Sequence, residues 1–253
     1  MMTSSAVSVQ DVTGGYHGDP VIHDVSWEVP HGSLAAIIGP NGGGKSTLLK
    51  SLVGLVKPWH GRVFLFGQEP EQGRKRVAYL PQAEEVDWQF PISVWDVVLQ
   101  GRWLRKGLWG RLTREDLDKA ESALTHFDIN HLAKTQIGSL SGGQRQRVFL
   151  ARAVAQEADL ILLDEPNTGL DARAQHELAD TLTRLKEEGR TIIVATHDLD
   201  CLTECFDQVL ALKSTVVAHG SPRDVLTAEI LTALFARHFP SLRETGEVVI
   251  HEP

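Results

Sequence analysis

The most informative part of the sequence is residues 34–47, LAAIIGPNGGGKST. Its first half is a short apolar run typical of a buried strand, and the apolar-periodic run LLKSLVGLV that follows predicts a helix. Between them, Gly39 to Ser46 matches the phosphate-loop pattern G-x-x-x-x-G-K-[ST]. The glycines let backbone N–H groups converge on phosphate oxygens, Lys45 supplies a positive charge, and Ser46 supplies a hydroxyl ligand for Mg²⁺. The stretch therefore predicts a nucleotide site at the end of a buried strand.

Two further apolar runs end in residues that can do chemistry. LILLDEP (160–166) ends in Asp164 and Glu165, and TIIVATHD (191–198) delivers His197. The carboxyl ends of buried strands in a phosphate-loop fold face the nucleotide, so we expect Asp164 to hold Mg²⁺ and Glu165 to accept a proton from an attacking water. The alternatives are a solvated strand end for the carboxylates and a structural role for the lone histidine. Because both runs are apolar enough to be buried, we favour function.

A second candidate anion site lies at residues 140–147, LSGGQRQR. A serine followed by two glycines and a polar run is typical of a helix start, where free backbone N–H groups and the positive end of the helix dipole face outward. The chain thus carries two phosphate-binding patterns about a hundred residues apart.

The order of the patterns predicts how the chain is organised. Residues 6–35 alternate and turn often, which predicts a small antiparallel layer, whereas 91–157 read as helices, with Thr113 and Asp116 forming a cap. Strands and helices alternate again afterwards, including a helix over 172–188 and another over 225–239. The predicted fold class is α/β: a P-loop NTPase (RecA-like) core over 1–87 and 158–220, with an N-terminal antiparallel β layer, an inserted helical subdomain over 88–157 and a C-terminal helical extension over 221–253.

The composition argues against several classes of protein. The chain has 253 residues, of which 42% are hydrophobic and 23% charged, and its formal net charge of -8 argues against a nucleic-acid partner. No apolar run is as long as a membrane span, and the opening MMTSSAVSVQDV lacks the pattern of a signal peptide. Cys201 and Cys205 give no disulfide framework or zinc spacing, and we expect them to be buried. These features predict a cytosolic protein.

The motifs together resemble those of a known family. GPNGGGKST, LSGGQRQR, LILLDEP, the GLD at 169–171 and ATHD, in that order, are similar to the nucleotide-binding subunit of an ABC transporter over nearly the whole chain. LSGGQ ahead of the acidic strand is the discriminating feature, because most other phosphate-loop NTPases lack it. Tyr16 resembles the aromatic residue that stacks on adenine, and Gln82, in YLPQ, resembles a glutamine that reaches Mg²⁺ or the attacking water.

The resemblance implies a role for each matching position. Glu165 would be the general base, His197 would contact the γ phosphate, and Gln82 would complete the catalytic set. Ser46, Gln82 and Asp164 would hold Mg²⁺, whereas Asn167 receives no role because the family varies there. The residues expected to contact ATP are Tyr16, Gly39, Pro40, Asn41, Gly42, Gly43, Gly44, Lys45, Ser46, Thr47, Ser141, Gly142, Gly143, Gln144 and Asp171.

The resemblance also explains the second anion site. It implies that Ser141, Gly142 and Gly143 bind the γ phosphate of ATP held by another copy of the chain, with Asp171 at the subunit junction. Two copies would then pack head to tail around a twofold axis and enclose two ATP molecules. Hydrolysis would loosen this dimer, since losing the γ phosphate removes contacts on both sides of the junction.

The cargo is predicted from residues 86–103, VDWQFPISVWDVVLQGRW. The segments VDW, FPI, DVV and GR within it resemble those of ABC subunits that serve importers of manganese, zinc and related divalent metals, with iron-chelate importers as the nearest relatives. Ala83, however, stands where relatives often carry a basic residue. Trp88, Phe90 and Trp95 could fill a core or receive a helix of the membrane subunit. The implied partners are integral membrane permease subunits and, indirectly, an extracytoplasmic substrate-binding protein, which places the chain on the inner face of the cell membrane.

Three other functions remain open at this point. The same enzyme could serve an iron chelate, haem or another small nutrient. A soluble ABC ATPase acting on DNA or ribosomes would usually carry paired cassettes or a long coiled coil, and the sequence shows neither. A regulatory module that holds ATP without hydrolysing it is disfavoured by Glu165 and His197.

Overall fold

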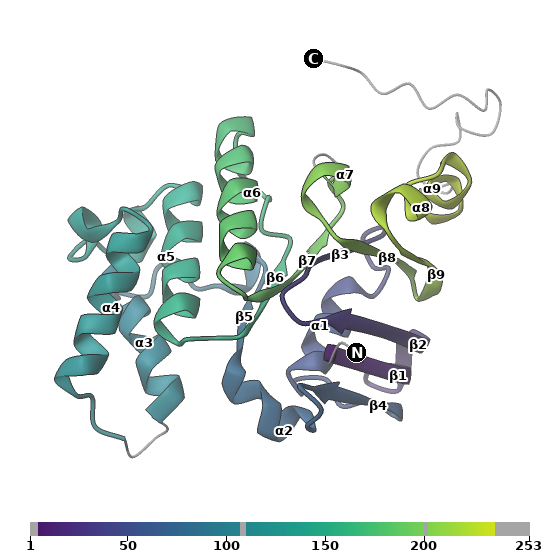
Figure 1. The fold of residues 1–253 in the computed structure, drawn as a ribbon, viewed down its shortest axis with the longest axis horizontal. Helices are drawn as coiled ribbons and strands as arrows, with labels where there is room; N and C mark the ends of the chain where they lie inside the picture. Colours follow the sequence, from purple (N-terminus) through teal and green to yellow (C-terminus); the bar gives the residue numbers. More distant parts are fainter. Residues whose placement is uncertain (1–4, 107–109, 200–201, 236–253) are drawn as a thin grey trace.

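The computed structural model describes residues 5–106, 110–199 and 202–235 (Figure 1). Among these residues, the larger sheet has six strands in the order β5-β6-β7-β3-β8-β9; the first five run parallel and β9 pairs antiparallel with β8. Their central runs are wholly buried because both faces of a parallel sheet are covered. The strands are β3 (Leu34–Ile38), β5 (Val77–Leu80), β6 (Leu160–Asp164), β7 (Thr191–Thr196), β8 (Gln208–Lys213) and β9 (Thr215–Gly220).

The smaller sheet contains the antiparallel layer predicted for residues 6–35, together with a third strand from outside that range, while residues 34 and 35 belong to the larger sheet. Its order is β2-β1-β4, and it consists of β1 (Ser5–Tyr16), β2 (Asp19–Pro30) and β4 (His60–Leu65). Alternate side chains such as Val7, Val25 and Trp27 share one core with Leu48 and Leu52 of helix α1 (Lys45–Leu52). The phosphate loop is therefore followed by a helix that lies in the core joining the two sheets.

Three longer helices form a group at one end of the molecule, away from the smaller sheet (Figure 1). Their apolar faces form one core that continues to the larger sheet at β6 and β7. This group corresponds to the predicted helical insertion. It contains α3 (Val94–Lys106), α4 (Arg114–His126) and α5 (Gly142–Ala155), with the short turns η3 (Asn130–Leu132) and η4 (Ile137–Ser139) between them.

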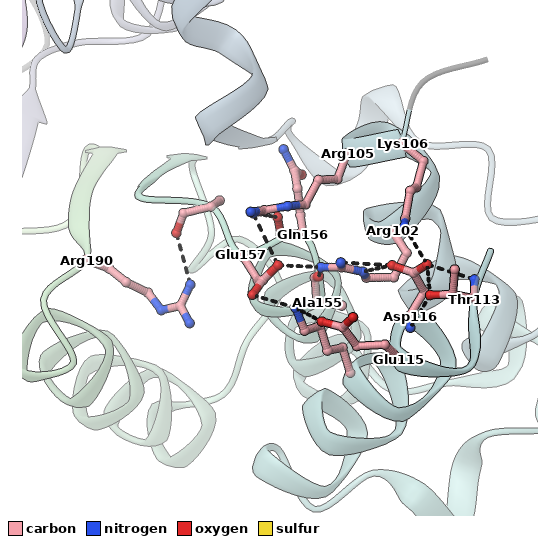
Figure 2. Close-up of polar contacts among 12 residues, drawn as sticks. Arg102, Arg105, Lys106, Thr113, Glu115, Asp116, Ala155, Gln156, Glu157 and Arg190 are labelled. Atoms are coloured by element: carbon pink, nitrogen blue, oxygen red, sulfur yellow. Dashed lines mark hydrogen bonds and ion pairs between the residues drawn. The ribbon is translucent and has the colours of Figure 1, made fainter. Parts of the chain in front are cut away.

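A buried ionic network joins these helices at the end far from the sequence LSGGQ (Figure 2). Arg102 of α3 is 3% exposed and donates to Asp116 of α4, to the carbonyl of Ala155 at the end of α5, and to Glu157 just beyond it. Asp116 also accepts from the backbone N–H of Thr113, which completes the predicted cap. Burying these charges is tolerable because each has a partner.

The remaining elements connect and flank the sheets. They are α2 (Pro70–Gly73), η1 (Arg74–Arg76), η2 (Ala83–Glu85), α6 (Ala172–Glu187), α7 (Leu202–Cys205), α8 (Pro222–Val225) and α9 (Ala228–Phe235). The prediction of one helix over 225–239 was wrong within the described residues. Leu226 is not helical, and Thr227 begins a new helix by accepting the N–H of Ile230. Cys205 is half-buried, and Cys201 and residues 236–253 lie outside the described residues.

Candidate functional site

The phosphate loop, residues 39–46, follows β3 and turns sharply into α1. A Cβ atom at Gly39 would lie 2.0 Å from the carbonyl oxygen of Leu212, so only glycine fits there. Gly44 has a φ of +97°, and a Cβ there would lie 2.5 Å from a methyl group of Ile22. The loop therefore needs glycine for backbone reasons, and the same lack of side chains exposes a cradle of N–H groups.

Lys45 lies buried beneath this loop. Its ammonium donates to the carbonyls of Gly39, at 3.0 Å, and Pro40, at 3.3 Å, and lies 3.1 Å from Oε1 of Glu165. The side chain is only 4% exposed, so protein contacts, rather than solvent, surround its ammonium group and hold it in position. A cation held at this place can meet phosphate oxygens that enter the cradle.

A cluster of oxygen and amide groups lies beside the lysine. Ser46 Oγ donates to Asp164 Oδ1 at 3.0 Å, and Gln82 Nε2 donates to Ser46 Oγ at 3.0 Å and to the same carboxylate oxygen at 3.3 Å. Tyr79 donates to Asp164 Oδ2 at 3.3 Å. Burial raises the pKa of Asp164 above its ordinary value, although the three hydrogen bonds oppose the shift.

The hydroxyl, amide and carboxylate oxygens of this cluster fit Mg²⁺. Hard oxygen donors from one or two protein groups, completed by phosphates and waters, are what Mg²⁺ prefers. Ser46, Gln82 and Asp164 lie within hydrogen-bond distance of one another, and with the Gln82 amide turned to present its oxygen in place of Nε2, one small cation could contact all three. The predicted metal ligands are thus brought together.

Glu165 and His197 meet at the edge of the larger sheet. Strands β6 and β7 run parallel with Asp164 opposite Ala195, so their next residues leave the sheet side by side. Glu165 has a φ of +50°, uncommon for a side-chain-bearing residue, and its N–H donates to the carbonyl of Ala195. Nδ1 of His197 lies 2.8 Å from Glu165 Oε2. The strained turn aims the carboxylate between the lysine and the histidine.

These groups line one cleft of about 490 Å³. The volume is of the size that small-molecule sites occupy in proteins. Of the predicted residues, Asn41, Gly42, Gly43, Gly44, Lys45, Ser46, Thr47, Gln82, Glu165 and His197 line it, together with Val21, Glu84 and Thr168.

The other predicted contacts lie elsewhere in the same chain. Ser141 caps α5 and shares a reciprocal capping box with Gln144, and Asp171 caps α6 by accepting the N–H of Ala174. Tyr16 ends β1 and is 42% exposed. None of these four lines the cleft of the phosphate loop. The structure therefore separates the sequence LSGGQ from the phosphate loop of its own chain.

Two polar groups near the site were not predicted from the sequence. Tyr79 is the one polar residue of the strand VAYL, and its position on β5, next to β6, brings it to Asp164. Asn167 donates to Asp198 Oδ2 at 3.0 Å, across the strand ends that carry Glu165 and His197. A polar residue in an apolar strand was a usable signal for Tyr79, whereas Asn167 gave none.

Comparison with known proteins decides the family. The sequence pattern of the family described as ABC transporter matches residues 22–168. The chain belongs to the ABC transporter family. The match spans the phosphate loop, the sequence LSGGQ and the acidic strand end, and so confirms the family and the α/β phosphate-loop fold.

Individual ABC relatives cover almost the whole chain. The manganese transport system ATP-binding protein MntB of Bacillus subtilis is 43% identical over 238 residues, which cover 94% of this chain and 95% of that protein. The zinc transport system ATP-binding protein TroB of Treponema pallidum is 42% identical over 94% of this chain and 90% of its own. Among solved structures, an inward-facing ABC transporter of the metal-chelate type has a TM-score of 0.82 and 33% identity, and covers 92% of this chain and 89% of that one.

Across 5–106, 110–199 and 202–235, we find no helix with the length and hydropathy needed to cross a membrane. The same residues hold no group of three His, Cys, Asp or Glu side chains arranged to bind a metal ion.

Proposed function

We propose that this chain is the ATP-hydrolysing subunit of an ABC importer for a divalent metal ion. One observation carries the catalytic part: Lys45, Glu165 and His197 meet in one cleft beside the phosphate loop. The names of the relatives support the cargo, because two proteins that match almost the whole chain are named for manganese and zinc transport.

ATP would bind with its phosphates in the glycine cradle. Lys45 would then exchange its contacts with the Gly39 and Pro40 carbonyls for phosphate oxygens, since an ammonium has three donors to place. Mg²⁺ would be held by Ser46, Gln82 and Asp164, where it would neutralise charge on the β and γ phosphates. The raised pKa of Asp164 would fall once a cation lies beside it, so the carboxylate would be ionised with the metal present.

Glu165 would accept the proton of the attacking water. Its carboxylate is 14% exposed and bonded to Lys45 on one oxygen and His197 on the other. With the carboxylate ionised, Nδ1 of His197 donates to it, and in the protonated ring Nε2 would carry a second N–H that could be donated to the γ phosphate. The two contacts hold the carboxylate in one orientation, which is what a general base requires.

The separation of the two phosphate-binding segments supports an ATP-dependent dimer. Ser141 and Gly142 are exposed, whereas the phosphate loop is largely buried, so the helix start of α5 is free to meet a phosphate from outside its own chain. In a twofold pair each copy would complete the site of the other, with Asp171 at the junction. This arrangement gives a role to the predicted contacts of the sequence LSGGQ and to Asp171, which lie away from the cleft.

The chain would act below integral membrane permease subunits, on the inner face of the cell membrane, and would respond through them to an extracytoplasmic substrate-binding protein. Phe90 is 59% exposed and suits an anchoring contact with a permease helix. Trp88 and Trp95 pack partly against the core of the helical group, so their main role is packing. An iron chelate is the second candidate cargo, because a solved transporter of the metal-chelate type and a protein named for chelated iron transport both resemble this chain over most of its length.

The catalytic proposal is tested with Glu165→Gln. The variant should bind ATP as the native chain does but lose hydrolysis by about 100-fold or more, and should accumulate as an ATP-bound dimer, because an amide cannot accept the proton. Glu187→Gln, at the exposed end of α6, is the matched control and should hydrolyse at the native rate. Hydrolysis by Glu165→Gln at a near-native rate would remove Glu165 from the role of base.

The cargo proposal is tested in the complete transporter. The chain, its permease and its binding protein are reconstituted in vesicles, and ATPase activity is measured with binding protein loaded with Mn²⁺, Zn²⁺ or an iron chelate. Stimulation by Mn²⁺ or Zn²⁺ supports the proposal. Stimulation by the iron chelate alone assigns the second candidate and overturns the first.

A further inference from the structure

The segments that follow β6 and β7 are joined at two places. The first is the contact between Glu165 and His197. The second lies further out, where Nδ2 of Asn167 donates to Oδ2 of Asp198 at 3.0 Å. An ionised carboxylate can only accept, so the amide must present its N–H group to Asp198. A charge-assisted hydrogen bond of this kind between half-buried groups is stronger than one between neutral groups.

Asp198 is also anchored to the buried strand. Its backbone N–H donates to Oγ1 of Thr196, the last residue of β7, at 3.0 Å, and Thr196 is only 4% exposed. The side chain of His197 between them is 56% exposed, so packing alone does not hold it. The position of His197 therefore depends on its contact with Glu165 and on the residues before and after it, and Asn167 is one of the groups that hold the second of these.

Asn167 lies in a loop that is fixed at both ends. Glu165 begins it at the carboxyl end of β6, and Asp171 ends it by capping α6. Inside the loop, the N–H of Leu170 donates to the carbonyl of Asn167 at 3.1 Å. A Cβ atom at Gly142 would lie 3.2 Å from Leu170, so the loop also lies against the start of α5. A shift of the loop at this end is passed to Asn167 through a hydrogen-bonded turn of four residues.

We propose that Asn167 is a positioning residue that, through Asp198, holds His197 in line with Glu165. The same contact carries displacement of the loop at Leu170 and Asp171 to the histidine. The inference rests on the proposed ATP hydrolysis, because His197 acts in that reaction. It assigns Asn167 a task at a position where the sequence had indicated none.

The test reverses the hydrogen bond. Asn167→Asp places a second carboxylate against Asp198 and should lower kcat for ATP hydrolysis by about tenfold, with KM and ATP affinity changed less than about twofold. Asp198→Asn keeps an amide donor facing an oxygen and should lose about threefold. The double variant Asn167→Asp/Asp198→Asn restores a donor and an acceptor with their roles exchanged, and should recover kcat to within about twofold to threefold of native.

Two comparisons separate positioning from general damage to the fold. Asn130→Asp alters an amide that also donates to a side chain, Oγ1 of Thr125, far from the site, and should leave kcat unchanged. In a His197→Ala background, Asn167→Asp should have no further effect on kcat, because its effect passes through the histidine. Should Asn167→Asp not fold, Asn167→Ala removes the donor without adding charge, and is expected to lower kcat by about threefold at native KM.

The outcomes discriminate among the possible errors. The positioning role is overturned if the double variant does not recover kcat. It is also overturned if Asn167→Asp lowers kcat as much in the His197→Ala background as it does in the native chain. Native kcat in both Asn167→Asp and Asn167→Ala overturns it as well. Absence of ATP hydrolysis by the native chain itself would instead overturn the proposed function, so the two failures can be told apart.

Discussion

The phosphate loop (residues 39–46) and the signature segment (residues 140–147) both contain the start of a helix, but their surroundings differ. In the first, Lys45 is 4% exposed and its contacts lie in its own chain, with two loop carbonyls and Glu165. In the second, Ser141 and Gly142 are exposed, and the capping box with Gln144 satisfies only the helix start itself. The comparison teaches that the groups around Lys45 find their partners within the chain, whereas the start of α5 keeps an exposed surface.

The two segments are also held by different means. The phosphate loop is fixed locally, by a carbonyl of Leu212 that excludes a side chain at Gly39 and by a left-handed Gly44. The signature segment begins a helix whose other end is held by the buried network around Arg102. Changes in the first region should therefore affect nucleotide binding directly, and changes in the second should affect it only through assembly.

The largest effect is expected from Lys45→Met. The variant removes the charge that meets the phosphates while keeping the length of the side chain, and should weaken ATP binding and hydrolysis on the order of 100-fold. Binding of a fluorescent ATP analogue to the monomer measures the effect. Lys50→Met, one turn further along α1 and paired with Glu85, is the matched control and should bind ATP as the native chain does. Native ATP affinity in Lys45→Met would contradict the proposal that the phosphate loop binds the phosphates of ATP.

Ser141→Asp should give the next largest effect, and only in the dimer. Asp is a good N-cap, so α5 should still begin normally, but its charge would oppose a γ phosphate from another copy. ATP-driven dimerisation, measured by sedimentation, should weaken by about tenfold or more, with monomer affinity for ATP changed less than about twofold.

Ser139→Asp is the control for Ser141→Asp, because Ser139 is exposed in the turn just before the signature segment. It should dimerise as the native chain does. An unchanged sedimentation profile for Ser141→Asp with ATP would contradict the shared site.

A smaller effect on stability is expected at the far end of α5. Hydrogen bonds from the backbone and side chain of Thr113, from Arg102 and from Lys106 hold the pKa of Asp116 well below its ordinary value. The folded chain then keeps this carboxylate ionised where the unfolded chain binds a proton, so the stabilisation is complete above about pH 4 and is lost as the pH falls toward the lowered pKa.

Asp116→Asn tests the direction of this pH dependence of stability. Its Tm should lie below the native Tm by the largest margin near neutral pH, and the gap should narrow as the pH falls through about 4. Thermal unfolding followed by circular dichroism across this range measures it. Asp118→Asn, whose side chain is 55% exposed, is the control and should give a small, pH-independent change. A gap for Asp116→Asn that widens in acid would contradict the lowered pKa.

The sequence predicted the phosphate loop and both strand ends because their signals are local. A run such as LAAII is wholly apolar because the strand is buried on both faces, and the spacing of Gly39, Lys45 and Ser46 is set by the backbone of one loop. The parallel pairing of β6 with β7 is then enough to predict that Glu165 and His197, which follow these strands, lie side by side. The capping pair Thr113 and Asp116 was predictable for the same reason, since a capping box spans only four residues.

The parts that were not predicted depend on which segments become neighbours. Tyr79 reaches Asp164 only because β5 lies next to β6, and Asn167 reaches Asp198 only because two loops leave the sheet together. The break between α8 and α9 was missed because periodicity continues across Leu226, although the backbone does not. Contacts of this kind are set by packing, and periodicity in a single sequence does not report them.

The smallest effect is expected from Trp88, which links the two compared regions. The indole follows Gln82 by six residues, donates to the carbonyl of Ala83, and packs on α5 with Arg145 over its ring at 4.3 Å and Phe149 at its edge, 5.7 Å between centroids. Arg145 lies in the signature segment, so the segment after Gln82 and the start of α5 are held together by this stack. Trp88→Leu should weaken ATP-driven dimerisation by about threefold while monomer affinity for ATP stays native.

A double-mutant cycle separates the stack from general loss of packing. Trp88→Leu and Arg145→Met should show a coupling energy of about 1 kcal/mol in ATP-driven dimerisation, because each removes the same contact. Trp103→Leu is the control: this tryptophan is 44% exposed on α3, and its loss should leave dimerisation unchanged. Additive effects of the Trp88 and Arg145 variants would mean that the two regions are held independently, and that the signature segment takes its position from the network at the far end of α5 alone.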